Sequence, residues 1–191
     1  MGIGNRKVRL FIASSLDGYI ATKEESLDWL EQVEGKGDNG YSQFYETVDT
    51  VILGKKTFDW LISQRLSEWP YAEKQCYVYT HQQLQDMQDI HFTKEPVASL
   101  IHTLRQQPGQ DIWVVGGGEL IYSFLEQHLI DEVIVTMEPI LLGEGIPLFK
   151  PGFSTVELTL QQTKPYGQFV ELHYIVKKYK KKSAIKCAQT K

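Results

Sequence analysis

The chain has 191 residues, of which 42% are hydrophobic and 23% charged, and its formal net charge is −4. These values suit one globular domain with a substantial core, and the lack of any run of about 18 apolar residues excludes a membrane-spanning helix. The last fifteen residues hold seven lysines and no acid, which leaves −11 on the first 176 residues and argues against nucleic acid as the main partner.

The first half of the chain alternates strand and helix patterns. Strands are predicted at 7–13, 50–53, 75–80 and 91–94, and helices at 25–33, at 41–48 and from Gly54 through Leu61. A glycine-rich loop at 35–40 separates the first two helices.

The second half repeats this alternation and then changes character. Val97, Leu100, Ile101 and Leu104 are spaced i, i+3, i+4 and i+7, which predicts a helix with one buried stripe. A strand at 112–115, a helix at 119–128, a strand at 132–137 and a hairpin of two long strands, 155–163 and 168–177, follow.

This order of elements predicts an α/β domain over residues 1–177. Its sheet should be mixed but mostly parallel, with helices on both faces and a C-terminal antiparallel hairpin. Residues 178–191 form a basic tail that we expect to be disordered, although such a tail could also touch anionic surfaces. Cys76 and Cys187 are the two cysteines, which favours a reducing cytoplasm over a disulfide framework.

Two turns have the chemistry of phosphate sites. Gly116, Gly117 and Gly118 follow a strand and precede a helix, so backbone N–H groups there are open to a ligand and the helix dipole favours an anion. This predicts a nucleotide cofactor, whereas the alternative is a tight turn in a crowded sheet. The second turn places Gly54, Lys55, Lys56 and Thr57 at a helix start, where the lysines bind phosphate or are simply solvated.

Four segments together resemble the dihydrofolate-reductase-like superfamily. They are SLDGYIA at 15–21, VILGKKTF at 51–58, VVGGGELI at 114–121, and LIDEV at 129–133 followed by PILLGEGIPLF at 139–149. The last segment resembles the branch typified by the reductase domain of bifunctional riboflavin biosynthesis proteins. The zinc deaminase signature of those bifunctional enzymes is absent, so the resemblance is to a lone reductase module without a metal.

The resemblance implies an NADPH-dependent oxidoreductase that acts by hydride transfer. The turn at Gly54 and the strand end at Thr80 and His81 would hold the adenosine phosphates, with Lys55 where these reductases usually carry Arg. The 15–18 turn would close over the nicotinamide. The cofactor-binding residues predicted in this way are Ala13, Ile20, Gly54, Lys55, Lys56, Thr57, Thr80, His81, Gly116, Gly117, Gly118, Glu119 and Leu120.

The proton donor is the least defined part of the predicted site. Reduction of a C=N or C=O bond needs a proton, and a partly buried carboxylic acid commonly supplies it. Counting back from Gly54 makes Asp38 the first candidate, with capping of the following helix as the alternative role. Asp28 is the second candidate.

The predicted function is reduction of a small heterocyclic substrate, as in the 5-amino-6-(5-phosphoribosylamino)uracil reductases that the chain resembles. The alternatives are a dihydrofolate or pterin reductase and a nucleotide-binding protein without turnover. Riboflavin-type reductases commonly pair, so a homodimer is expected. Residues that could form an apolar wall for the substrate, or simply core, are Trp29, Phe44, Phe58 and Leu61.

Overall fold

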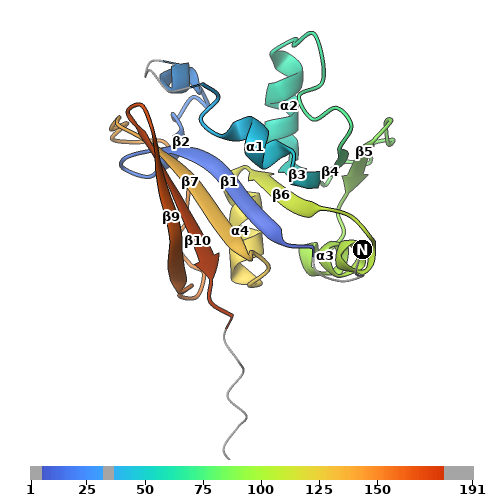
Figure 1. The fold of residues 1–191 in the computed structure, drawn as a ribbon. Helices are drawn as coiled ribbons and strands as arrows, with labels where there is room; N and C mark the ends of the chain where they lie inside the picture. The colour runs from blue at the N-terminus through green and yellow to red at the C-terminus, as the bar shows by residue number, and fades with distance from the viewer. Residues whose placement is uncertain (1–5, 32–36, 179–191) are drawn as a thin grey trace, which may run out of the picture.

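The computed structural model describes residues 6–31 and 37–178. One sheet of eight strands organises this part of the chain (Figure 1). Its strands are β1 (Val8–Ser15), β3 (Val48–Gly54), β4 (Gln75–Tyr79), β5 (Ile90–Thr93), β6 (Asp111–Gly116), β7 (Glu132–Glu138), β9 (Leu158–Tyr166) and β10 (Phe169–Val176).

The remaining elements are short helices and one small ribbon. The helices are α1 (Tyr41–Tyr45), α2 (Lys55–Ser63), α3 (Val97–Gln106), α4 (Gly118–Glu126) and the 3-10 helix η1 (Asp28–Glu31). Strands β2 (Tyr19–Ala21) and β8 (Ile146–Pro147) pair into a separate antiparallel ribbon that the sequence did not predict.

The strand order is β5-β4-β3-β6-β1-β7-β10-β9. Neighbours from β5 to β7 are parallel, whereas β10 pairs antiparallel with both β7 and β9. The hairpin β9–β10 closes one end of the sheet and β5 the other (Figure 1). The predicted fold class, a mostly parallel sheet with a C-terminal antiparallel hairpin, is confirmed.

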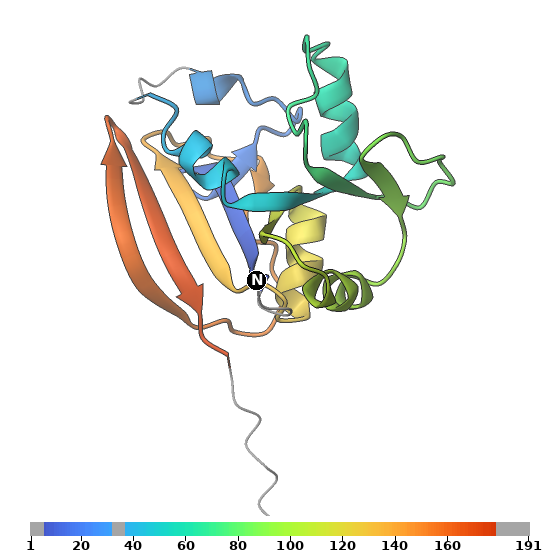
Figure 2. The same ribbon diagram turned by 45° about the vertical axis from the view of Figure 1, so that its right-hand side comes forward.

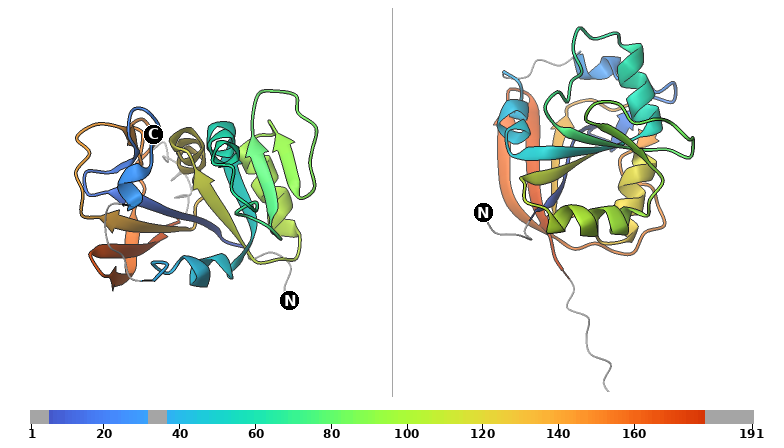
Figure 3. Two further views of the ribbon diagram at one scale, coloured as in Figure 1. Left: turned by 90° about the horizontal axis from the view of Figure 1, so that it is seen from above. Right: turned by 90° about the vertical axis from the view of Figure 1, so that its right-hand side faces the viewer.

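Helices cover both faces of the sheet. One apolar cluster joins α3 and α4 to the sheet through residues such as Leu104 and Phe124, and the two helices lie beside each other in Figure 2. A second cluster holds Phe44 of α1 and Phe58 of α2. Figure 3 shows α1 and α4 on opposite sides of the sheet. Because both faces are covered, the central strands are almost continuously buried, as in β3.

Two predicted helices are shorter than the sequence pattern suggests. The predicted helix at 25–33 is wrong within the described residues: Glu25 has a positive φ of 64°, and only η1 is helical. The Ser26 hydroxyl accepts a hydrogen bond from the Asp28 N–H at 3.1 Å, a local bond that competes with an α-helical start. Residues 32–33 of that prediction lie outside the described residues.

The second helix and the hairpin turn also differ from the prediction. Helix α1 ends at Tyr45 instead of 48, because Val48 is already a fully buried residue of β3. The hairpin turns at residues 167–168 and not at 165–167, with Tyr166 paired to Phe169. Pro165 therefore lies inside β9, where it is tolerated because β9 is the edge strand.

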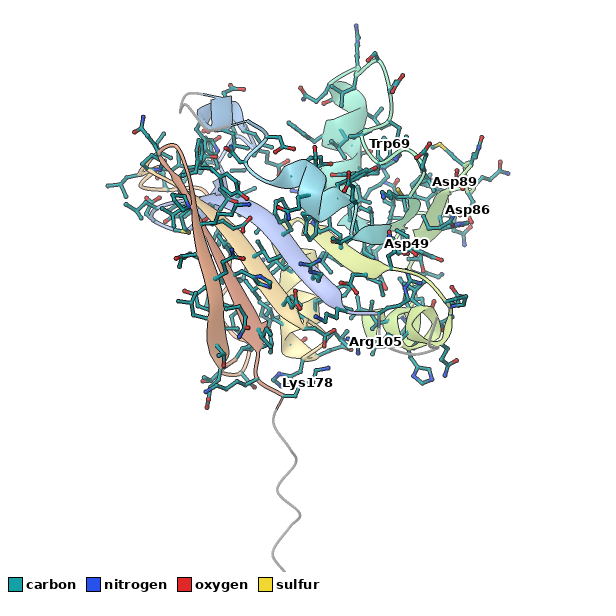
Figure 4. All side chains as sticks on the ribbon, in the orientation of Figure 1. Asp49, Trp69, Asp86, Asp89, Arg105 and Lys178 are labelled. Carbon is teal, nitrogen blue, oxygen red and sulfur yellow. The ribbon has the colours of Figure 1, made fainter. Side chains whose placement is uncertain are left out.

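The amino-terminal ends of the parallel strands are held together by ion pairs. Arg6 is buried and contacts Asp49, and its guanidinium donates to the Thr50 hydroxyl at 2.6 Å. At the same edge, Arg105 and Lys178 both pair with Asp131, at 2.5 and 2.6 Å (Figure 4). These structural charges lie at the end of the strands opposite to the glycine turns.

Candidate active site

The two glycine turns meet at the carboxyl edge of the sheet. Leu53 at the end of β3 pairs with Gly116 at the end of β6. A Cβ atom built on Gly54 would lie 3.7 Å from both the Gly116 carbonyl oxygen and the Gly117 nitrogen. The structure thus brings together the two turns that the sequence predicted as phosphate sites.

Gly116 and Gly117 of the second turn differ in backbone conformation. Gly116 has a φ of +124°, which side chains rarely adopt, and a cis peptide bond joins it to Gly117. Gly117 has an ordinary φ of −76°, and its nearest neighbour for an added Cβ is the Thr57 hydroxyl at 3.6 Å. Of the three glycines, only Gly116 has a positive φ. The backbone conformation therefore does not require glycine at position 117, although there is space beside it.

Helix α4 begins directly behind this turn. The N–H groups of Leu120 and Ile121 both bond to the Gly117 carbonyl, at 3.0 and 3.1 Å, so the first helical turn is formed. The side chain of Glu119 is exposed and pairs with Lys150. The positive end of the α4 dipole lies at Gly117, whereas Gly118 is buried and an added Cβ there would lie 3.3 Å from the Pro147 carbonyl oxygen.

The cationic cluster at α2 is assembled, but its charges are already paired. Lys55 Nζ lies 2.5 Å from Asp59 Oδ1, and Lys56 Nζ lies 2.7 Å from Glu25 Oε1. The hydrogen bond from Lys56 to Glu25 raises the pKa of that lysine. Sequence reasoning counted two cations here and missed their two carboxylate partners.

The predicted adenosine end lies on the next strand. Gly54 pairs with Tyr79, so Thr80 and His81 follow at the adjacent strand end. Thr80 is buried and its hydroxyl accepts the Gln82 N–H at 3.1 Å, whereas His81 is exposed.

The turn after β1 is tied to a distant loop. Asp17 accepts hydrogen bonds from the Ser15 hydroxyl at 2.6 Å and from the Gly143 N–H at 2.7 Å, and these bonds lower its pKa. Gly18 has a positive φ of 84°, and its carbonyl accepts the Leu148 N–H at 2.8 Å. This turn and residues 142–148 consequently form one unit. Of the predicted cofactor residues nearby, Ala13 pairs with Thr136 of β7, and Ile20 packs on the first core cluster.

The predicted substrate wall is largely core. Trp29, Phe44 and Phe58 are only 3 to 5% exposed. The Phe44 ring stacks on Phe11 with centroids 4.1 Å apart, and Leu61 packs against the same cluster. Their role in substrate binding stays a prediction.

A groove opens between the β2–η1 segment and α2. It has a volume of about 650 Å³ and is lined by Asp28, Lys56, Asp59 and Trp60 among others. Asp28, the second candidate for the acid, therefore lies in a groove near the predicted cofactor turns.

Asp38, the first candidate, performs the alternative role that the sequence allowed. It is exposed and accepts the N–H groups of Ser42 at 2.8 Å and Gly40 at 3.1 Å. Hydrogen bonds from Ser42 and Gly40 lower the pKa of Asp38. They favour the charged form, which has no proton to donate.

One acidic residue at this edge was missed. Glu138 ends β7 and is 3% exposed, and Oε2 of its carboxyl group has no hydrogen-bond partner in the described chain. Burial raises its pKa to about 7. The available sequence signal was an acid at the last position of an apolar strand, before Pro139.

Metal-binding clusters and membrane-spanning helices are both absent from the described residues. No group of three or more His, Cys, Asp or Glu residues is placed to hold a metal ion within 6–31 and 37–178. No helix in these same ranges is long and apolar enough to cross a bilayer. Cys76 is a buried free thiol, and Cys187 lies outside the described residues.

Comparisons with known proteins agree on one family and one fold. The family model described as RibD C-terminal domain matches residues 6–172. The Bacillus subtilis protein YwjB is 46% identical over 172 residues, which cover 89% of this chain and 98% of YwjB. The crystal structure of a putative riboflavin biosynthesis protein from Shewanella sp. PV-4 is 31% identical with a TM-score of 0.83, over 90% of this chain and 99% of that one. Dihydrofolate reductase from Enterococcus faecalis, complexed with NADP(H), shares the fold at 15% identity with a TM-score of 0.60, over 90% of this chain and 97% of that one.

Proposed function

Because the chain belongs to the RibD C-terminal domain family, we propose that it is an NADPH-dependent reductase of a small heterocyclic substrate. The observation that carries this proposal is the space at Gly117, where a Cβ would meet nothing closer than 3.6 Å although the backbone does not require glycine. A cofactor phosphate fits such a space beside a helix N-terminus. The putative riboflavin biosynthesis protein and the dihydrofolate reductase among the structural neighbours support the choice of chemistry.

NADPH fits the residues at the carboxyl edge. Gly116 to Gly118 and the α4 N-terminus would face its pyrophosphate, and Lys55 and Thr57 its adenosine phosphate. Ala13 and Ile20 would border the nicotinamide, whose reduced ring supplies a hydride when it is bound. The protein contributes orientation and a dry environment at this edge.

Turnover tests this function directly. Purified protein is mixed with NADPH and, separately, with dihydrofolate or 5-amino-6-(5-phosphoribosylamino)uracil, and loss of reduced nicotinamide absorbance is followed. Oxidation with the uracil supports the riboflavin-type reaction, and oxidation with dihydrofolate supports the alternative of a folate reductase. NADPH that binds but is not oxidised by either compound would favour a nucleotide-binding protein without turnover.

We expect NADPH to bind about tenfold more tightly than NADH, because one charge-assisted contact to the extra phosphate contributes about 1.5 kcal/mol. The preference should be no larger, since Lys55 must leave Asp59 to make it. Fluorescence titration of both cofactors measures the ratio. Lys55→Met should remove the preference, whereas the exposed Lys94→Met should keep it. Equal affinities for the two cofactors, or a ratio insensitive to salt, would contradict this site.

We also propose a homodimer that uses the hairpin. Strand β9 is an edge of the sheet, and Leu158, Leu160, Val170 and Ile175 of the hairpin are 38 to 52% exposed. Apolar side chains on an open edge favour pairing with another chain. Light scattering should give twice the chain mass of 22.0 kDa.

A matched pair of variants locates the dimer interface. Leu160→Glu should yield monomers, whereas Leu84→Glu, at a residue 41% exposed elsewhere, should leave the dimer intact. A monomeric wild-type protein at micromolar concentration would contradict the dimer.

We propose a cytoplasmic location for the enzyme, in keeping with the free thiol of Cys76.

A further inference from the structure

Glu138 lies where the proposed chemistry takes place. It is the last residue of β7 and pairs with Ser15, the last residue of β1, at the same carboxyl edge as the glycine turns. Side chains alternate along β7, and Ile134 packs in the cluster beneath α1. Glu138, four residues further on, therefore faces the α1 side of the sheet.

The other end of the same strand provides an internal comparison. Glu132 is equally buried, at 4% exposed, and lies on the same face of β7. It contacts Lys7 Nζ at 2.6 Å, Arg9 Nε at 3.0 Å and His173 Nε2 at 3.0 Å. Burial opposes ionisation of Glu132, but the charges of Lys7 and Arg9 and the hydrogen bonds from Lys7 and His173 lower its pKa overall. A buried glutamate with a structural role is thus compensated in this fold.

Glu138 lacks such compensation within the described chain. Its Oε2 is buried without a hydrogen-bond donor, and burial is the only cause of its raised pKa. The ionisable groups on neighbouring elements are committed elsewhere. Asp17, beyond β1, accepts the hydrogen bonds of Ser15 and the 142–143 backbone. Glu171 on β10 lies opposite Thr136, on the same face as Glu138, and burial raises its pKa although Lys164, His173 and Arg9 oppose that shift. The neutral carboxylic acid is the form that this environment favours.

We propose that Glu138 is the proton donor of the reduction. This inference rests on the proposed function. NADPH, when bound, would supply the hydride to the carbon of a C=N or C=O group and become NADP+. The O–H bond of the Glu138 carboxyl group would break as its proton goes to the nitrogen or oxygen, and the Glu138 carboxylate would regain a proton from water. Atoms and charge balance without any further reactant.

The two other candidate donors, Asp38 and Asp28, are accessible to water. Asp38 is exposed and its hydrogen bonds favour the carboxylate. Asp28 lines the open groove beside α2, where water has access. Glu138 combines burial with a position at the carboxyl edge.

The first test follows the Glu138 carboxyl group itself. Infrared spectra of protein with labelled glutamate carbons should show a protonated carboxyl band that titrates near neutral pH and is missing in Glu138→Gln. Glu171→Gln, at a partly buried glutamate on β10, should keep the band. Addition of NADP+ should shift it, because the nicotinamide would lie beside Glu138. If the protonated carboxyl band is absent at pH values above the ordinary pKa range of glutamate, the proposal is overturned. It is also overturned if bound NADP+ does not shift the band.

The second test is turnover with the uracil compound or dihydrofolate, whichever oxidises NADPH. Glu138→Gln should lower kcat by roughly 100- to 10,000-fold with NADPH affinity unchanged, whereas Glu171→Gln keeps wild-type kcat. The wild-type kcat should fall as pH rises above neutrality, and the residual rate of Glu138→Gln should not. Wild-type rates in Glu138→Gln, with loss of rate in Asp38→Asn or Asp28→Asn, would overturn Glu138 alone. Failure of the wild-type protein to bind NADPH would instead overturn the proposed function.

Discussion

Gly117→Val is expected to weaken NADPH binding by at least about 100-fold, or about 2.7 kcal/mol, while the chain stays folded. The reason is local. Gly117 has a φ of −76°, and an added Cβ would make only an ordinary contact of 3.6 Å with the Thr57 hydroxyl. The folded chain can therefore accept a side chain that the cofactor phosphate cannot, because the branched methyl groups would occupy its approach to the backbone N–H groups.

Fluorescence titration with NADPH measures this effect, and circular dichroism with thermal unfolding reports on the fold. Gly117→Ala serves as the graded comparison, since a single methyl group should cost less affinity than the isopropyl group. Normal NADPH binding by Gly117→Val would reduce the triple glycine to a turn. A chain unfolded by valine but folded with alanine moves the test to the alanine variant, whose binding then decides.

The sequence predicts the fold best where a residue pattern is compatible with only one secondary structure. The i, i+3, i+4, i+7 spacing from Val97 to Leu104 produced α3 as expected, because its four apolar residues are all buried. The 25–33 segment also holds four apolar residues, Leu27, Trp29, Leu30 and Val33, yet the predicted helix did not form in its described part. The Ser26 and Thr22 side chains bond locally to the backbone there and compete with the helical hydrogen bonds.

The site was predicted unevenly. Gly54 and Gly116 were found because glycine at a strand end leaves a direct trace in the sequence, and parallel strands bring their carboxyl ends to one edge. The pairing of Lys55 with Asp59 lies at i, i+4 and was within reach of sequence reasoning. The pairing of Lys56 with Glu25 joins residues 31 positions apart, so it could not be predicted from local spacing.

Glu138 is the clearest case of a site residue that the sequence alone does not reveal. Glu132 and Glu138 begin and end the same apolar strand, and their local sequence does not show which of them has charged partners in the fold. Their difference arises from which side chains fold against each end: Lys7, Arg9 and His173 at one, and no cation among the described residues at the other. These partners come from β1, from Lys7 just before it and from β10, so the contrast exists only in three dimensions.

The same contrast predicts how stability depends on pH. Glu138 has a pKa of about 7 in the folded chain and an ordinary value of 4.5 once unfolded. Below 4.5 both states are protonated, so burial of Glu138 costs nothing through ionisation. As pH rises from 4.5 to 7 the unfolded state loses its proton first, and the free energy of unfolding falls by about 3 kcal/mol. Above 7 the loss is complete.

Glu138→Gln removes this titration and isolates it from all other groups. We expect the difference in unfolding free energy, variant minus wild type, to rise by about 3 kcal/mol between about pH 4.5 and pH 8 in denaturant titrations. Glu132→Gln should give the opposite sign in a lower pH range: because the pKa of Glu132 is lowered in the folded chain, the difference should fall as pH rises toward 4.5 and stay level above it. A flat difference for Glu138→Gln would mean that the carboxyl group is ionised and solvated at neutral pH. A variant that gains stability at neutral pH while it loses turnover would instead show that the fold keeps an unfavourable buried acid for its chemistry.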